Sequence, residues 1–111
     1  MKCKHLLNCD IAGFTYYEGP VVFKQLEVGT AVQLVAEQEN RHDPNAIAVY
    51  FGKHKLGFIP RNDNKTLSIF FEQGYSDIFV AYINRITPDE YPENQIGIVV
   101  YLKEKKRRIE K

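Results

Sequence analysis

The sequence holds only two cysteines, Cys3 and Cys9, and their spacing argues against a disulfide between them. Both fall in a stretch with strand character, where they would lie roughly 20 Å apart at about 3.3 Å per residue. The same separation argues against one tetrahedral zinc ion held by Cys3, His5 and Cys9, although these residues share strand parity. We therefore expect two buried, reduced thiols.

A long hydrophobic run is also absent. The first apolar stretch is interrupted by Asn8 and Asp10, so we expect neither a signal peptide nor a membrane span, and we predict a cytoplasmic protein. No glycine-rich phosphate loop and no Ser-His-Asp or Cys-His set stands out. The 111 residues allow one domain, and 44% apolar residues, with seven Phe and seven Tyr, can fill one core.

Excess positive charge is small, because the formal net charge is +1. Residues 103–111 hold six basic and two acidic residues, which leaves nine basic and twelve acidic residues in 1–102. We interpret 1–102 as the folded domain and 103–111 as a basic tail that is either solvated or an auxiliary phosphate contact. A basic site on the folded part must therefore be local.

Alternating or β-branched runs predict about six short strands, and turn-forming residues separate them. The predicted strands are 5–14, 30–37, 45–51, 55–59, 77–86 and 95–102. Residues 52–54 have the length and the glycine of a hairpin connection, and 88–94 should form an exposed loop. The pattern favours a mostly β fold, a small antiparallel OB-like β-barrel with one or two short helices.

Residues 62–74 predict one helix. Capping oxygens precede an apolar spacing of helical period, and Gly74 supplies a left-handed stop. The capping candidates are Asn62, Asp63 and Asn64, and the apolar positions are Leu67, Phe70 and Phe71. We expect this helix to close one end of the barrel, and we expect a second, short helical turn at 23–28.

The most informative stretch is 37–49, where a strand ends in a cluster of turn formers. Asn40, Asp43 and Asn45 can each hydrogen-bond the neighbouring backbone and hold this connection rigid. A rigid turn needs such residues with or without a ligand, so the pattern alone leaves both interpretations open.

This stretch resembles the HIRAN domain family, whose pattern combines spaced acidic and amide residues with an Asn-Ala-Ile sequence. The matching residues are Glu37, Asn40, Asp43, Asn45, Ala46, Ile47 and Val49. Residues 57–61 resemble the family's second block, and 11–19, with paired tyrosines, resemble its opening block. The resemblance covers roughly residues 9 to 101.

The resemblance implies an OB-related barrel that binds the 3′ end of single-stranded DNA in DNA repair or replication. In this family an aspartate at the place of Asp43 accepts a hydrogen bond from the terminal hydroxyl, tyrosines stack on bases, and a basic residue near Arg61 meets a phosphate. His42, Phe58 and Thr15 depart from residues found in the family. Stacking can survive the ring changes at positions 42 and 58, but a histidine-to-phosphate hydrogen bond at position 58 and a charge contact at position 15 cannot. The expected DNA-binding residues are Asp43, Tyr16, Tyr17, His42, Phe58, Arg61, Asn40 and Lys55.

The chemistry of these residues agrees with that role. A carboxylate only accepts hydrogen bonds, so Asp43 suits a free hydroxyl and repels a terminal phosphate. If both tyrosines lie in a strand, only one of them can face the groove and the other is part of the core, and we favour Tyr16 as the outward one. Arg61 and Lys55 are placed to hold the nearest phosphates.

Two other classes of function compete with a DNA-binding module. His42, Asp43 and His54 could form a metal-dependent phosphodiesterase or hydrolase site, but neighbours in a turn rarely converge on one ion. A protein-interaction barrel without DNA binding fits the acidic balance of the folded part. We expect a module that is not an enzyme, with no metal and no cofactor, whose partners are DNA and replication or repair proteins.

Overall fold

The computed structural model describes residues 3–91 and 94–104. The strands are β1 (Cys3–Asp10), β2 (Ala31–Ala36), β3 (Ile47–Phe51), β4 (His54–Phe58), β5 (Phe79–Ile86) and β6 (Ile96–Lys103). The α-helices are α1 (Gly19–Val22) and α2 (Arg61–Glu72), and the 3-10 turns are η1 (Phe14–Tyr16), η2 (Phe23–Gln25) and η3 (Ser76–Ile78). The predicted mostly β fold with six strands and short helices is confirmed.

The strands form one antiparallel sheet in the order β1-β6-β5-β2-β3-β4. Its halves meet where β2 pairs with β5 through only two residue pairs, Ala31 with Tyr82 and Val32 with Ala81. The sheet is not closed into a barrel, because within the described residues its two edges are joined only by an isolated bridge between Ala12 and Phe58. The predicted OB-like fold is confirmed, with a sheet that stays open between its two edges.

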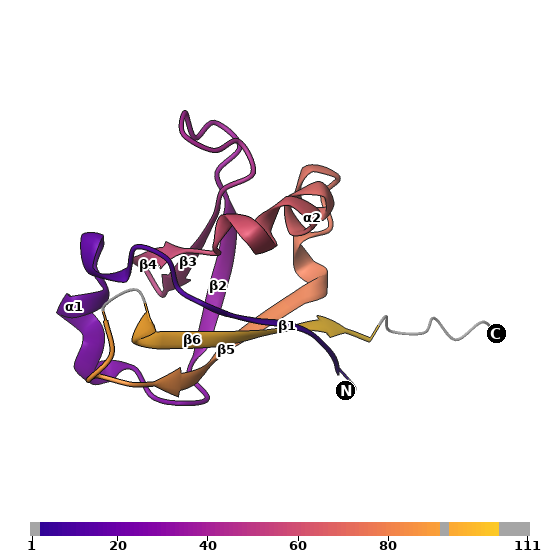
Figure 1. Cartoon of the computed structure of the whole chain (residues 1–111). Helices are drawn as coiled ribbons and strands as arrows, with labels where there is room; N and C mark the ends of the chain where they lie inside the picture. Colours follow the sequence, from indigo (N-terminus) through magenta and orange to yellow (C-terminus); the bar gives the residue numbers. More distant parts are fainter. Residues whose placement is uncertain (1–2, 92–93, 105–111) are drawn as a thin grey trace.

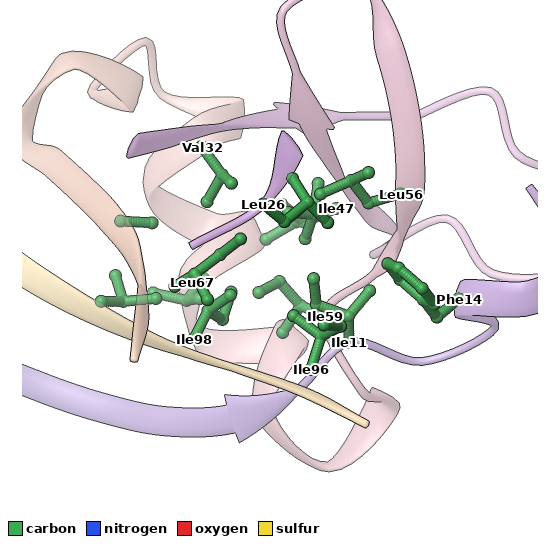
Figure 2. Packing of buried hydrophobic residues seen from close by; sticks show 14 of the residues in the cluster. Ile11, Phe14, Leu26, Val32, Ile47, Leu56, Ile59, Leu67, Ile96 and Ile98 are labelled. Atoms are coloured by element: carbon green, nitrogen blue, oxygen red, sulfur yellow. The ribbon is translucent and has the colours of Figure 1, made fainter. Parts of the chain in front are cut away.

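The core lies between the two halves of this bent sheet, and helices cover its ends. Figure 1 shows α1 and α2 at opposite ends of the sheet. Figure 2 shows Ile47 and Leu56 from β3 and β4, Ile96 and Ile98 from β6, and Leu67 from α2 directed into the same interior. These side chains are all at most 2% exposed, so burial of aliphatic surface from both halves holds the sheet in its bent form.

The first strand is shorter than the predicted 5–14. β1 ends at Asp10, and Gly13 turns the backbone with a positive φ of 74°, so the chain enters η1 instead of continuing as a strand. The ring of Phe14 is then buried against Gly19, where an added Cβ would lie 2.4 Å from that ring. The glycine leaves the space that this aromatic side chain occupies.

Cys3 and Cys9 both lie in β1 as free thiols, as the spacing predicted. The prediction that Cys3 and Cys9 share strand parity is wrong. The register with β6 shifts between His5 and Leu7, and this β-bulge turns Cys9 to the other face of the strand. Cys3 is exposed, which contradicts the predicted burial, whereas Cys9 packs against the core. Burial, with Asp63 and Asp10 nearby, raises the pKa of the Cys9 thiol to about 12.

The remaining strands lie close to the ranges predicted from the sequence. The hairpin between β3 and β4 is confirmed, with Phe51 paired to His54 across the turn. The predicted basic tail lies outside the described residues beyond Glu104, and so do Pro92 and Glu93 of the predicted 88–94 loop. In the described part of the chain, no helix is long and apolar enough to cross a membrane.

Candidate functional site

A cleft of about 300 Å³ opens where η1, the turn between β2 and β3, the end of β4 and the start of α2 meet. Its lining residues are Ala12, Gly13, Tyr16, Tyr17, Asn40, His42, Asp43, Ala46, Phe58, Ile59, Arg61 and Asn64. Seven of the eight predicted site residues are thus gathered around one hollow, although they come from segments far apart in the sequence. Lys55 is the eighth, and it does not line the cleft.

One wall of the cleft is the turn that carries Asp43. The Asn40 side-chain oxygen accepts hydrogen bonds from the backbone N–H groups of His42 (2.8 Å) and Asp43 (3.0 Å). Asp43 Oδ1 in turn accepts from the backbone N–H of Asn45 at 2.9 Å. The turn is therefore held by its own side chains, as the sequence predicted. The side-chain oxygen of Asn40 is used in hydrogen bonds to the backbone of the turn.

The Asp43 carboxylate lies at the junction of this turn with α2. Its Oδ2 accepts from Asn64 Nδ2 at 2.8 Å and lies 3.7 Å from Arg61 Nε, and the side chain is 17% exposed. The hydrogen bonds from Asn64 and from the backbone of Asn45, with the charge of Arg61, lower the pKa of the Asp43 carboxyl. At neutral pH the group is ionised and only accepts hydrogen bonds. Because each carboxylate oxygen accepts about two, capacity remains for a ligand in the cleft.

Asn64 lines the cleft, although its position in the sequence predicted a helix cap. Helix α2 begins at Arg61 after Pro60, and no side chain caps its N-terminus, so Asn62, Asp63 and Asn64 are not its caps. Asn64 is 3% exposed and lies three residues before buried Leu67, on the inward face of the helix. Counting the helical period back from Leu67 would have placed this amide inside.

The second wall of the cleft is aromatic. Tyr16 is 86% exposed and Tyr17 is 39% exposed, and the Tyr17 ring packs edge to face on Phe58 with centroids 5.4 Å apart. The expectation that one of the two tyrosines is core is wrong, because η1 replaces the strand on which the parity argument depended. Tyr16 is the freer of the two rings.

Of the two predicted basic residues, Arg61 lies at the rim of the cleft and Lys55 lies behind one of its walls. Arg61 is largely exposed and donates from Nη2 to the His42 carbonyl at 3.0 Å, so its guanidinium lies at the rim beside Asp43. Lys55 lies behind the aromatic wall, where its Nζ is 4.4 Å from the Phe58 ring centroid and 4.9 Å from that of Tyr17.

The same Lys55 Nζ donates to Glu37 Oε2 at 2.6 Å. Glu37 Oε1 accepts from Asn40 Nδ2 at 3.1 Å, which joins this ion pair to the turn that carries Asp43. Burial alone would raise the pKa of the Glu37 carboxyl, but the hydrogen bonds from Lys55 and Asn40 lower it below its usual value.

The alternative metal-dependent site would need His42, Asp43 and His54 to converge. In the described part of the chain they do not form a group of three ligands. His54 Nδ1 lies 3.0 Å from Glu18 Oε1, at the start of α1. Across residues 3–91 and 94–104, no three His, Cys, Asp or Glu side chains form a group that could hold a metal ion. What the cleft offers is one ionised acceptor, exposed and packed rings, and one guanidinium.

Comparison with known proteins identifies the same fold and family. Residues 4–105 match the family model of the HIRAN domain. A crystal structure of a protein from Lactobacillus plantarum is 25% identical, with a TM-score of 0.74 over 91% of this chain and 95% of that one. The HIRAN domain of human HLTF shares the fold, with 17% identity and a TM-score of 0.60 over 88% of this chain and 76% of that one. No curated protein sequence matches the chain.

Proposed function

Because the chain belongs to the HIRAN domain family, we propose that it is a nucleic-acid-binding module whose cleft takes the 3′-hydroxyl end of single-stranded DNA. Membership of a family of DNA-binding domains supports nucleic-acid binding. The finer assignment, a strand end with a free hydroxyl, depends on the residues of the cleft. In this account the domain is a binding module that does no chemistry of its own.

The observation that carries the proposal is the environment of Asp43. Its carboxylate is oriented by the Asn45 backbone and by the buried Asn64 side chain, and it borders a cleft of about 300 Å³. An oriented, ionised acceptor receives a hydrogen bond from a hydroxyl, and it repels the two negative charges of a terminal phosphate. Such a group discriminates between strand ends that differ by one phosphate.

The two sides of the cleft supply the remaining contacts. Tyr16, the most exposed ring, would stack on a terminal base, which is worth about 1–3 kcal/mol per base and tolerates any base. Tyr17, Phe58 and His42 would complete the surface on which the terminal nucleotides lie. Arg61 would meet the phosphate next to the terminus, since its guanidinium lies at the rim.

The charge balance makes this a binder of few phosphates. Residues 1–102 carry nine basic and twelve acidic side chains, so electrostatic attraction along a length of DNA is weak. For single strands, log K falls by about 0.7 per log unit of salt for each phosphate neutralised. We therefore expect a shallow dependence on salt, corresponding to one or two contacts near the end. By family analogy, replication or repair proteins would supply the associated enzymatic activity.

Titration against three labelled ligands at low salt tests this function. The ligands are a single strand with a 3′-hydroxyl, the same strand with a 3′-phosphate, and a blunt duplex. The proposal predicts tightest binding to the free hydroxyl. Equal binding to all three, or binding to none, would contradict end recognition and would favour a domain whose partner is a protein.

A further inference from the structure

The walls of the cleft come from segments that are separate in the sequence, so something must hold them at a set distance. The turn wall carries Asp43, and the aromatic wall is made by Tyr17 and Phe58. The Lys55–Glu37 ion pair connects these walls through short contacts on both sides.

On the aromatic side, Lys55 contacts both rings. Its ammonium nitrogen lies 4.9 Å from the Tyr17 centroid and 4.4 Å from the Phe58 centroid, within the range of cation–π attraction. Its backbone carbonyl also accepts the N–H of Glu18 at 2.8 Å, which ties the segment just after Tyr17 to β4. Lys55 therefore fixes both the ring and the chain that bears it.

On the turn side, the contact runs through Glu37. Its two carboxylate oxygens divide their roles, since one accepts from Lys55 at 2.6 Å and the other from Asn40 at 3.1 Å. Asn40 then holds the backbone N–H of Asp43. Three hydrogen bonds in series thus lead from the ammonium group to the residue that carries the acceptor.

Lys55 is poorly placed to meet a phosphate. Its side chain is 23% exposed and that of Glu37 is 27% exposed, so the pair is largely covered. Releasing the ammonium group to a ligand would leave the Glu37 carboxylate without its cation and would remove the charge from behind two rings. Both changes cost more in a partly buried site than on an open surface.

We propose that Lys55 is a positioning residue: paired with Glu37 behind the aromatic wall, it sets the spacing between the Tyr17 ring and the Asp43 carboxylate without contacting the nucleic acid. This inference depends on the proposed function for its effect on binding, but the spacing itself can be measured in the free protein. It assigns Lys55 and Arg61, two cations near one site, to different tasks.

The salt dependence of binding separates these tasks. Lys55→Met keeps the aliphatic stem and removes the charge, and we expect about three- to thirtyfold weaker binding of a 3′-hydroxyl single strand, the range for network residues outside a ligand contact. The ratio of the affinities of wild type and Lys55→Met should be the same at every salt concentration. Arg61→Gln, by contrast, should reduce the slope of log K against log salt by about 0.7, the value for one phosphate contact.

Two further variants serve as controls for Lys55→Met. Lys53→Met makes the same charge change at an exposed position of the adjacent turn and should leave affinity within about twofold. Lys55→Arg keeps a cation for Glu37 and for both rings and should restore most of the lost affinity. Thermal unfolding of each variant checks that binding is measured on folded protein.

A measurement without DNA keeps the inference testable whatever the ligand is. In two-dimensional amide NMR spectra of the free protein, Lys55→Met should shift the signals of His42 and Asp43, and Lys53→Met should not. Unshifted signals would overturn the inference even if DNA binds. A slope reduced by about 0.7 in Lys55→Met would also overturn it, because Lys55 would then be a phosphate contact. Failure of the wild-type protein to bind any strand, with the shifts present, would reject the proposed function and leave the positioning role intact.

Discussion

Replacing Asn64 by leucine tests whether the Asp43 carboxylate is oriented by a buried donor. Leucine has a similar size but no N–H group, so Asp43 Oδ2 loses its 2.8 Å hydrogen bond at a position where Asn64 is 3% exposed. A hydrogen bond to a charged group contributes about 1.5–3 kcal/mol, and leaving a buried charge without its donor costs a similar amount. We expect the free energy of unfolding at neutral pH to fall by about 2–3 kcal/mol.

The loss should depend on pH, because the bond is to an ionised carboxylate. Hydrogen bonding from Asn64 is the largest cause of the lowered pKa of Asp43, so its stabilisation is fully present above the ordinary value near 3.8. It is lost as the pH falls through the lowered pKa of the folded state. The difference in stability between wild type and Asn64→Leu should therefore be constant above about pH 5 and shrink below it.

Urea denaturation followed by far-ultraviolet circular dichroism measures both effects. Asn62→Leu is the matched control, since Asn62 is exposed on the same helix, and its effect should stay within about 0.5 kcal/mol. A change of less than about 0.5 kcal/mol in Asn64→Leu, or a loss that does not vary between neutral and acid pH, would show that Asn64 does not stabilise the ionised Asp43 carboxylate.

Three further predictions follow from the same structure. Of the two thiols, exposed Cys3 should react rapidly with a disulfide reagent at mildly alkaline pH, whereas Cys9, with a pKa of about 12, should react only on unfolding; equal rates would contradict its burial. Because the pKa values of both Asp43 and Glu37 are lowered, wild-type stability to urea should decline as the pH falls through the acid range, and a flat profile would show that neither carboxylate is stabilised. Gly57→Ala should destabilise the fold by about 2 kcal/mol or more, seen as a lower urea midpoint, because the added Cβ would lie 2.3 Å from a backbone carbonyl oxygen at a φ of +148°.

The strands could be predicted from the sequence because each shows a local pattern. The hairpin of β3 and β4 is an example, since its glycine turn and alternating residues are adjacent in the chain. Whether the sheet closes into a barrel could not be predicted in the same way. The outcome depends on how many residue pairs join β2 to β5 and on the bridge between Ala12 and Phe58, which are distant in sequence.

Seven of the residues that line the cleft could be predicted as a set, but their arrangement could not. The motif around Asp43 marked its turn, and the self-contained hydrogen bonds of Asn40 follow from local chemistry. The neighbours of these residues depend on tertiary packing. The rotation of helix α2 places Asn64 against Asp43. The register of β4 places Lys55 behind the aromatic rings, whereas the sequence had led us to expect Lys55 as a phosphate contact.

Exchange of the acceptor at position 43 tests directly whether the Asp43 carboxylate recognises the strand end. The measurement is the ratio of dissociation constants for a 3′-phosphate strand and a 3′-hydroxyl strand, in wild type and in Asp43→Asn. An amide can donate as well as accept and carries no charge, so it should bind both ends similarly. We predict a ratio of about ten or more for wild type, which corresponds to about 1.4 kcal/mol, and a ratio near one for Asp43→Asn. The same ratio in both proteins would contradict recognition of the strand end by Asp43.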